Sequence, residues 1–207
     1  MTEYYVPTAP GEAEFTEKRS RFLGHVRYVE TEEEARDFIA AMKKEYYDAR
    51  HNCWCYIIRD GAERYSDDGE PQGTAGIPML EVLRREGVCN AVCVVTRYFG
   101  GVLLGAGGLL RAYTKSASDA LSAAGRSVVR RWIRCELECA YSAAEKLKNE
   151  LTAAGSVIDS VEYHSAVTIR VLVREEEIDT FKARVFDFTA GRTQVNVTGE
   201  VLKAVPV

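Results

Sequence analysis

Residues 91–124, AVCVVTRYFGGVLLGAGGLLRAYTKSASDALSAA, decide the fold, because they run from a strand through glycines into a helix. Ala91 to Tyr98 is a nearly continuous apolar run, typical of a central strand that is covered on both faces. From Leu109 onward the apolar residues recur at helical spacing, and the pattern stops at Gly125. We therefore expect a sheet with helices packed on it, joined by a glycine-rich loop.

The chain upstream of this stretch alternates between strand and helix patterns. Thr31 and Glu34 have the spacing of a capping box at the start of a helix. Asp60-Gly61 is a tight-turn signal between two strand-like segments. In order, we predict a strand over 21–29 with His25 on its outer side, a helix from Thr31, a hairpin of strands 53–59 and 63–65, an irregular segment 66–78 and a helix over 78–86.

The chain downstream of Gly125 has the order β-α-β-β-α-β, which is typical of a ferredoxin-like sandwich with both helices on one face. Ser142 and Glu145 form a second capping-box pattern. The boundary should fall near Arg126. The expected class is therefore α+β with two domains, residues 1–126 and residues 127–207.

Composition narrows the class of protein. The 207 residues are 46% hydrophobic and 28% charged, with a formal net charge of −4. No segment approaches the roughly 18 apolar residues of a membrane span, and the first residues do not resemble a signal peptide, so we expect a soluble, cytoplasmic protein without membrane contact. An acidic chain can hold nucleic acid only through a local basic patch.

The six cysteines lack the spacing of zinc ligands or of a redox motif. Within each pair the even spacing would place both thiols on one face of a strand. His51, Cys53 and Cys55 could offer three metal ligands, but no second cluster completes a tetrahedral set. We predict buried free thiols, no metal and no cofactor.

The glycine-rich loop is the first candidate site. A strand that enters a helix through glycines presents backbone N–H groups to an anion, yet the loop lacks the Lys-Ser/Thr of a P-loop and the third glycine of a dinucleotide motif. Arg111 and Lys115 follow on one polar stripe, where the helix dipole alone disfavours cations. The predicted nucleic-acid or anion-binding residues are Arg97, Tyr98, Gly100, Gly101, Gly105, Gly107, Gly108, Arg111 and Lys115.

Asp67, Asp68 and Glu70 form the second candidate, as a possible wall of the same pocket. Clustered carboxylates can act as acid/base or metal groups. Two other interpretations stay open. The acids can simply build a turn, or they can pair with Arg111 and Lys115 in a salt-bridge network that closes the loop.

The motifs RYSDDGEPQGTAGIPML and VVTRYFGGVLLGAGGLLRAYTKSASDAL, with KRSRFLGHV and HNCWCYIIRDG, resemble the Impact/YigZ family. The resemblance implies a first domain with the two-layer βα fold of elongation factor G domain four, and a second, ferredoxin-like domain. It also implies contact with RNA or the ribosome, which is a fold-level analogy. Eukaryotic members regulate translation through a partner protein. Since their additional N-terminal partner-binding domain has no counterpart here, we expect a bacterial-type, two-domain member.

Three functions follow. The leading interpretation is a non-enzymatic binding or regulatory protein that contacts RNA or the translation apparatus. The alternative is a hydrolase or transferase that acts on a phosphorylated small molecule through Asp67, Asp68 and Glu70. A third is a regulator with a protein partner and no nucleic-acid contact.

Overall fold

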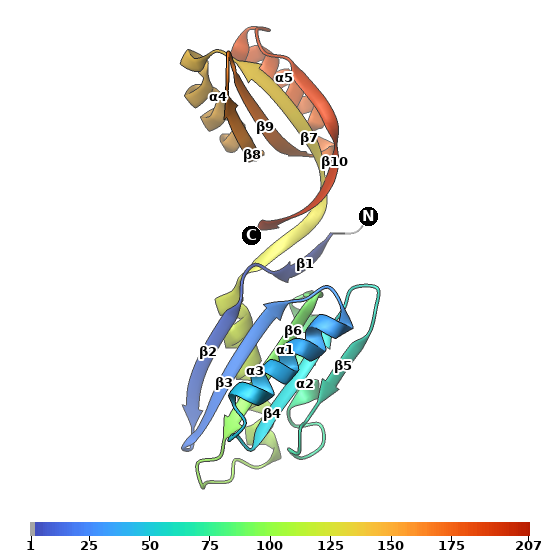
Figure 1. Ribbon diagram of the computed structural model, residues 1–207, viewed down its shortest axis with the longest axis vertical. Helices are drawn as coiled ribbons and strands as arrows, with labels where there is room; N and C mark the ends of the chain where they lie inside the picture. The colour runs from blue at the N-terminus through green and yellow to red at the C-terminus, as the bar shows by residue number, and fades with distance from the viewer. Residues whose placement is uncertain (1–2) are drawn as a thin grey trace. The chain divides into compact units, whose positions relative to one another are not determined.

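The computed structural model describes residues 3–207, which divide into two compact units. Residues 3–129 with 204–207 form the first unit, and residues 130–203 form the second (Figure 1). The expected α+β class with two domains is confirmed. Separate folding of fragments cut at residue 126 stays a prediction. No helix among the described residues has the length and apolar character needed to span a membrane.

The first unit is built on a five-stranded antiparallel sheet with strand order β2-β3-β6-β4-β5. The central strand β6 (Ala91–Tyr98) is the apolar run, and all of its residues except the last are buried. It pairs with β3 (Ser20–Tyr28) and β4 (His51–Ile57). The edges are β2 (Gly11–Glu17) and β5 (Glu63–Ser66). The sequence therefore predicted the central strand correctly.

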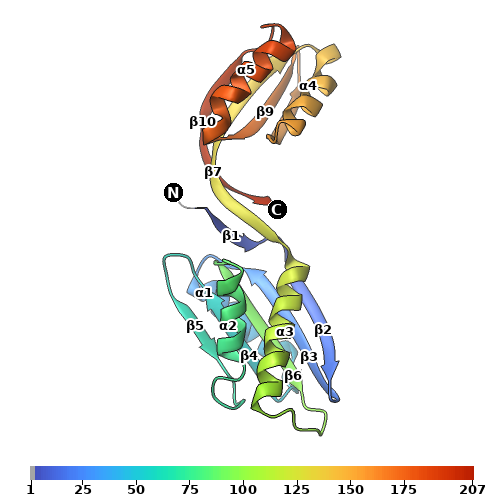
Figure 2. The ribbon, with the colours of Figure 1, turned by 180° about the vertical axis from the view of Figure 1, so that it is seen from behind.

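Helices cover both faces of this sheet. On one face α2 (Gly76–Arg85) and α3 (Ala106–Ala124) pack over the larger core, as Figure 2 shows. On the other face α1 (Glu32–Glu45) covers a smaller core (Figure 1). The resemblance implied two layers, a sheet and its helices. Helix α1 forms a third layer on the opposite face of the sheet. His25 was expected on an outer, solvated side, and that prediction is wrong: it is 7% exposed, and its ring lies 5.4 Å from that of Tyr46, just after α1.

Small residues let α3 lie directly on the sheet. A Cβ at Gly24 of β3 would sit 2.6 Å from the Ser116 carbonyl oxygen of α3. A Cβ atom does not approach another heavy atom that closely without a shift of the structure, so the close approach requires glycine at this position. Gly24 therefore allows α3 to pack directly against β3.

Of two predicted helix starts in the first unit, one is confirmed and the other lies earlier in the chain than expected. The capping box at Thr31 is confirmed, because its side chain accepts a hydrogen bond from the Glu34 N–H at 3.1 Å. Helix α3 begins at Ala106, three residues before Leu109. Lys115 consequently lies in the third turn of the helix, beyond the reach of the end-of-helix dipole that the sequence argument invoked.

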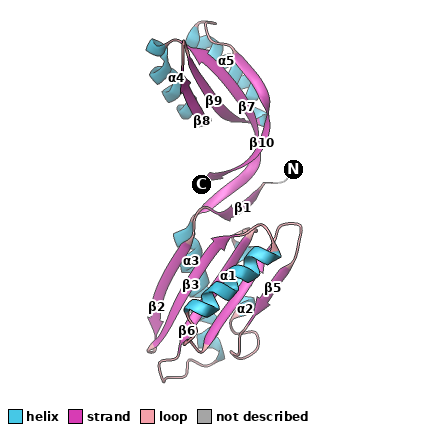
Figure 3. Cartoon of the chain, viewed as in Figure 1, coloured by secondary structure: helices cyan, strands magenta, loops and turns pink. Residues whose placement is uncertain are grey.

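The second unit is an antiparallel sheet with both helices on one face (Figure 3). Strand β7 (Arg126–Cys139) begins in the first unit, where its first residues pair with β1 (Tyr4–Pro7). In the second unit it lies between β10 and β9, and β8 follows β9, so the order β10-β7-β9-β8 is ferredoxin-like. The remaining elements are α4 (Tyr141–Ala153), β8 (Val157–Tyr163), β9 (Val167–Arg174), the 3-10 turn η1 (Glu175–Glu177), α5 (Ile178–Thr189) and β10 (Val195–Pro206).

The predicted capping box at Ser142 is wrong. Helix α4 begins one residue earlier, at Tyr141, and its N-cap residue is Ala140, whose side chain makes no capping hydrogen bond. A Ser-x-x-Glu pattern is a local signal, and here it lies inside the first turn, where the hydroxyl cannot reach the N–H groups it would cap.

All six cysteines are free. Cys53 and Cys55 share one core with Cys93, as expected for thiols on one face of a sheet. Cys89 precedes β6 and does not belong to a strand, so the prediction that it lies with Cys93 on one face of a strand is wrong. Cys135 and Cys139 lie together in the core of the second unit.

Candidate functional site

The acidic turn and the glycine-rich loop meet at one pocket of about 360 Å³. Gly69, Glu70 and Pro71 form one side, and residues 103–106 form the other. His51 and Arg97 also line it. Two segments that lie about thirty residues apart in the sequence therefore build a single concave surface on the first unit.

Asp67 caps helix α2, although it lies several residues before the helix in the sequence. Its Oδ1 accepts hydrogen bonds from the N–H groups of Ala75 (3.0 Å) and Gly76 (2.8 Å), and its Oδ2 accepts one from Gly73 (2.8 Å). The N-cap residue, Ala75, makes no side-chain capping bond, so Asp67 satisfies N–H groups that would otherwise lack a partner. The three bonds give this carboxylate a structural role.

Asp68 braces the turn against two neighbouring elements. Its Oδ1 lies 2.6 Å from Lys43 Nζ of α1, and its Oδ2 accepts the Asn52 N–H of β4 at 2.7 Å. Asp68 itself has a positive φ of 44°, which Asp tolerates better than most residues. Its carboxylate is thus engaged inside the molecule as well.

Glu70 belongs to a buried polar network. Its Oε1 accepts hydrogen bonds from Arg97 Nη1 (2.6 Å) and from the Tyr113 hydroxyl (2.9 Å). The Glu70 and Arg97 side chains are only 3% and 6% exposed. Burial, reinforced by the nearby Cys53 and Glu70, raises the pKa of Tyr113 well above its usual range, so this hydroxyl stays a neutral donor. Arg97 therefore belongs to the floor of the pocket and is not an exposed surface cation.

His51 completes the floor, and its role was missed from the sequence. Its Nδ1 lies 2.9 Å from the Asp68 carbonyl oxygen and must donate to it, because a carbonyl only accepts. Its Nε2 lies 3.9 Å from Glu70 Oε1, beyond hydrogen-bond distance. The sequence had suggested only a metal-ligand role for His51. His51 and Glu70 are 19 residues apart in the sequence, so no local pattern indicates that they lie close together.

A basic patch lies next to the pocket. Lys18, Arg111 and Lys115 line a second hollow of about 250 Å³ together with one acidic residue, Glu17, and Arg19 follows Lys18 in the turn between β2 and β3. We call Lys18, Arg19, Arg111 and Lys115 the basic patch. Lys115 also lies 2.6 Å from Asp119 and 5.2 Å from the centre of the Phe15 ring.

The patch does not pair with the acidic turn. Within residues 3–207, Glu70 pairs with Arg97, Asp68 pairs with Lys43, and Arg111 forms no ion pair. The interpretation that Arg111 and Lys115 close the loop by binding Asp67, Asp68 and Glu70 is therefore wrong. The acids already have partners that the helical spacing of the stripe could not reveal.

The glycine-rich loop is positioned by its neighbour in β3. A Cβ at Gly100 would lie 2.0 Å from the Arg19 carbonyl carbon, so glycine is required where the loop passes the turn. The Ser20 hydroxyl accepts the Gly100 N–H at 3.2 Å and receives Arg97 Nη2 at 3.3 Å. The start of α3 at Gly105 has no side-chain cap, and Gly101, Gly105 and Gly107 are exposed.

The remaining candidates are the Tyr98 hydroxyl, a metal site and the Cys53 thiol. The Tyr98 hydroxyl donates to Asp48 Oδ1 at 2.8 Å, at the end of β6. In the described part of the chain, no group of three His, Cys, Asp or Glu side chains is arranged to hold a metal ion. Burial raises the pKa of the Cys53 thiol, which lies 3.0 Å from the Asp67 carbonyl oxygen, and a protonated thiol is a poor nucleophile.

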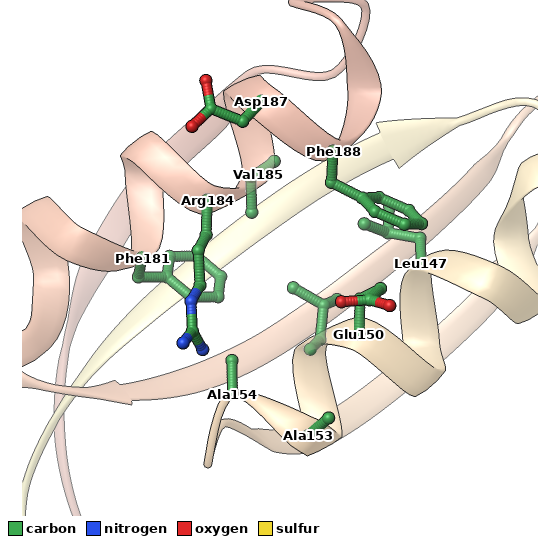
Figure 4. Close-up of a pocket in the computed structure, with 10 residues that line it drawn as sticks. Leu147, Glu150, Ala153, Ala154, Phe181, Arg184, Val185, Asp187 and Phe188 are labelled. Carbon is green, nitrogen blue, oxygen red and sulfur yellow. The ribbon is translucent and has the colours of Figure 1, made fainter.

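A separate hollow of about 430 Å³ lies between α4 and α5 in the second unit. In Figure 4 Phe181 and Arg184 of α5 face Ala154, and Phe188 lies beside Leu147. The hollow is lined by seven apolar residues and by the charged residues Glu150, Arg184 and Asp187, which are exposed. It contains no buried polar group of the kind that lines the pocket of the first unit.

Comparison with known proteins covers nearly the whole chain. A family model described as the Impact N-terminal domain matches residues 18–121, and one described as a domain of unknown function (DUF1949) matches residues 137–192. "IMPACT family member YvyE" of Bacillus subtilis is 40% identical over 94% of this chain and 91% of its own length. "IMPACT family member YigZ" of Escherichia coli is 33% identical over 94% of this chain and 98% of its own.

More distant and structural matches agree with these. "Protein IMPACT" of Mus musculus is 33% identical over 50% of this chain and 34% of its own length. A solved structure titled "Crystal structure of an hypothetical protein" is similar at a TM-score of 0.60 with 32% identity, covering 95% of this chain and 98% of its own. Both domains and most of the length match bacterial relatives, and the chain belongs to the IMPACT family.

Proposed function

We propose that this chain is a binding protein without catalytic activity that holds RNA phosphates on the basic patch and the adjoining glycine-rich loop. The observation that carries the proposal is Arg111, an exposed guanidinium with no acidic partner within residues 3–207. It lines one hollow with Lys18 and Lys115. Arginine and lysine side chains grouped at one surface neutralise successive phosphates.

The backbone beside the patch favours the same ligand. Helix α3 starts at an exposed glycine without a side-chain cap and has no acidic residue in its first turn. The N–H groups at such a helix end carry a partial positive charge and can bind phosphate. The loop therefore adds neutral donors to a patch of charged ones.

The hydrolase or transferase alternative is less well supported. Asp67 caps α2, Asp68 is bound to Lys43 and to a backbone N–H, and Glu70 is paired with Arg97. A general acid or base must be able to exchange a proton with a substrate. Carboxylates held in this way are poorly suited to that task, so we favour binding over catalysis.

The test is fluorescence anisotropy with a labelled single-stranded RNA at low salt. The wild type should bind, and if three cations contact phosphates, log K should fall against log salt with a slope of about −2. The triple variant Lys18→Ala, Arg111→Ala, Lys115→Ala should lose most of the affinity and show a flatter slope.

The matched control is Lys44→Ala, Lys146→Ala, Lys182→Ala, which removes three exposed positive charges elsewhere. It should bind almost as well as the wild type. Equal binding by the two triple variants, or no RNA binding by a folded wild type, would reject the proposal. The second outcome would favour a regulator that acts only through a protein partner.

A further inference from the structure

The pocket beside the basic patch has a buried polar floor that the proposed phosphate contacts do not use. His51 and Arg97 are each more than nine-tenths buried and line it. His51 Nε2 has no hydrogen-bond partner among the described residues, and Glu70 Oε1 lies 3.9 Å from it. A nearly buried polar atom without a partner costs free energy, so this imidazole nitrogen points to a ligand that satisfies it.

The charge of the floor selects the kind of group that fits. Arg97 is neutralised by Glu70 at 2.6 Å, so the floor is not a net cation that would attract a phosphate. It offers guanidinium donors, a carboxylate acceptor and an imidazole nitrogen within one small space. Such a mixture of donors and acceptors complements the hydrogen-bonding edge of a nucleobase, which carries both.

The walls of the pocket are apolar. They are formed by Pro71, Phe99, Leu103, Leu104 and Leu109. Leu103 is 83% exposed and Phe99 is 42% exposed. Exposed apolar side chains around a polar floor are the arrangement that holds an unstacked base, with the ring between apolar groups and its edge on hydrogen-bonding groups.

Pocket and patch adjoin one another. Leu104 lines both the pocket and the hollow that contains Lys18, Arg111 and Lys115. Arg50, which is exposed, lines the pocket as well. A base in the pocket would therefore leave its own backbone phosphates within the region of the basic patch. The volume of about 360 Å³ lies within the range of small-molecule sites.

We infer that this pocket receives one unstacked nucleobase of a single-stranded RNA whose phosphates lie on the basic patch. This inference rests on the proposed function and adds to it that the RNA is single-stranded, with a base free to leave the stack. A duplex, whose bases are paired, should bind less well than a single strand of the same length.

The variants that test the inference lie in the apolar wall. Phe99→Ala with Leu103→Ala removes two exposed side chains, so the fold should be retained, as circular dichroism would check. This double variant should bind single-stranded RNA about tenfold more weakly, since stacking of one base is lost. Phe186→Ala with Leu202→Ala removes two exposed apolar side chains of the second unit that line neither the pocket nor the hollow of the basic patch, and this control should leave affinity unchanged.

A second set of experiments changes the RNA and leaves the protein as it is or uses the same double variant. An oligonucleotide with one 2-aminopurine should become more fluorescent when wild type binds, because the base leaves its stacked neighbours, and less so with the double variant. An oligonucleotide of abasic residues should bind wild type as weakly as the normal oligonucleotide binds the double variant.

A free nucleoside monophosphate tests whether the neighbouring phosphates are needed. It should shift the NMR signals of His51 and Gly105 only weakly, because it lacks those phosphates. A free nucleotide that binds as tightly as the oligonucleotide would overturn the RNA assignment.

The outcomes separate the two proposals. RNA binding that needs the basic patch, but is indifferent to abasic residues and to the Phe99 and Leu103 changes, would reject the pocket inference and leave the proposed function standing. Absence of RNA binding by the folded wild type would reject both.

Discussion

The Arg97 guanidinium donates to the Glu70 carboxylate at 2.6 Å, in a place where both side chains are almost fully buried. Such a pair is costly to desolvate, and it is tolerated here because Tyr113 and Ser20 supply further hydrogen bonds. The pair ties β6 to the acidic turn and so fixes the floor of the pocket.

Removing one partner should therefore destabilise the first unit. Arg97→Ala leaves an uncompensated buried carboxylate, and we expect a loss of about 3–5 kcal/mol in the free energy of unfolding. The control is Arg84→Ala, whose partners Glu63 and Glu81 are exposed or half-exposed, and which should cost no more than about 1 kcal/mol. Urea denaturation measures both. Similar losses for the two variants would contradict this account of the buried pair.

Asp67 provides the second prediction. Asp67→Asn replaces one of two accepting oxygens by an NH₂ group, which would then face backbone N–H donors of residues 73–76. We expect a loss of about 2 kcal/mol in the free energy of unfolding. Asp37→Asn, on the exposed side of α1, is the isosteric control and should be close to neutral. A neutral Asp67→Asn would show that α2 does not depend on this cap.

The sequence predicted elements whose pattern is local. Strand β6 is a continuous apolar run, and the start of α1 is given by Thr31 and Glu34. Strand β2 was missed because its outward residues are mostly glutamates, and a strand rich in charge at a sheet edge resembles a loop. Strand β1 was missed because four residues carry little periodicity, and its partner lies more than a hundred residues away in β7.

The site was predictable only in outline. The glycines and the acids indicated one concave surface, which the structure has. The roles of the acids could not be predicted, since they depend on which distant donor faces each carboxylate: Lys43 for Asp68, Arg97 for Glu70 and the start of α2 for Asp67. The turn that carries Lys18 was also missed, because its position beside α3 follows from β2.

A pair of glycines gives the third prediction. Gly100→Ala would place a Cβ 2.0 Å from the Arg19 backbone, so the loop or the turn must move, and we expect a loss of about 2–3 kcal/mol in the free energy of unfolding. Gly107→Ala is the matched control, because its Cβ would meet only the Arg111 side chain, at 3.6 Å, inside a helix. It should stabilise the protein by up to about 1 kcal/mol. Thermal unfolding compares the two, and a harmless Gly100→Ala would mean that the loop does not lie on the turn.

The last prediction concerns pH. His25 is buried beneath α1 beside Tyr46, and its Nε2 has no hydrogen-bond partner among the described residues. Burial lowers the pKa of His25 below its usual 6.5, although Glu12 and Glu45 partly oppose that shift. Below about pH 6.5 the unfolded chain therefore binds a proton at this residue that the folded chain does not, and stability must fall as the pH falls through that range towards the folded pKa. His25→Leu removes this titration and should flatten the dependence of the unfolding free energy on pH between neutral and mildly acid solution. His164→Leu, an exposed histidine in the second unit, should leave that dependence almost unchanged. If wild type and His25→Leu lose stability in parallel on acidification, His25 is not the residue that titrates.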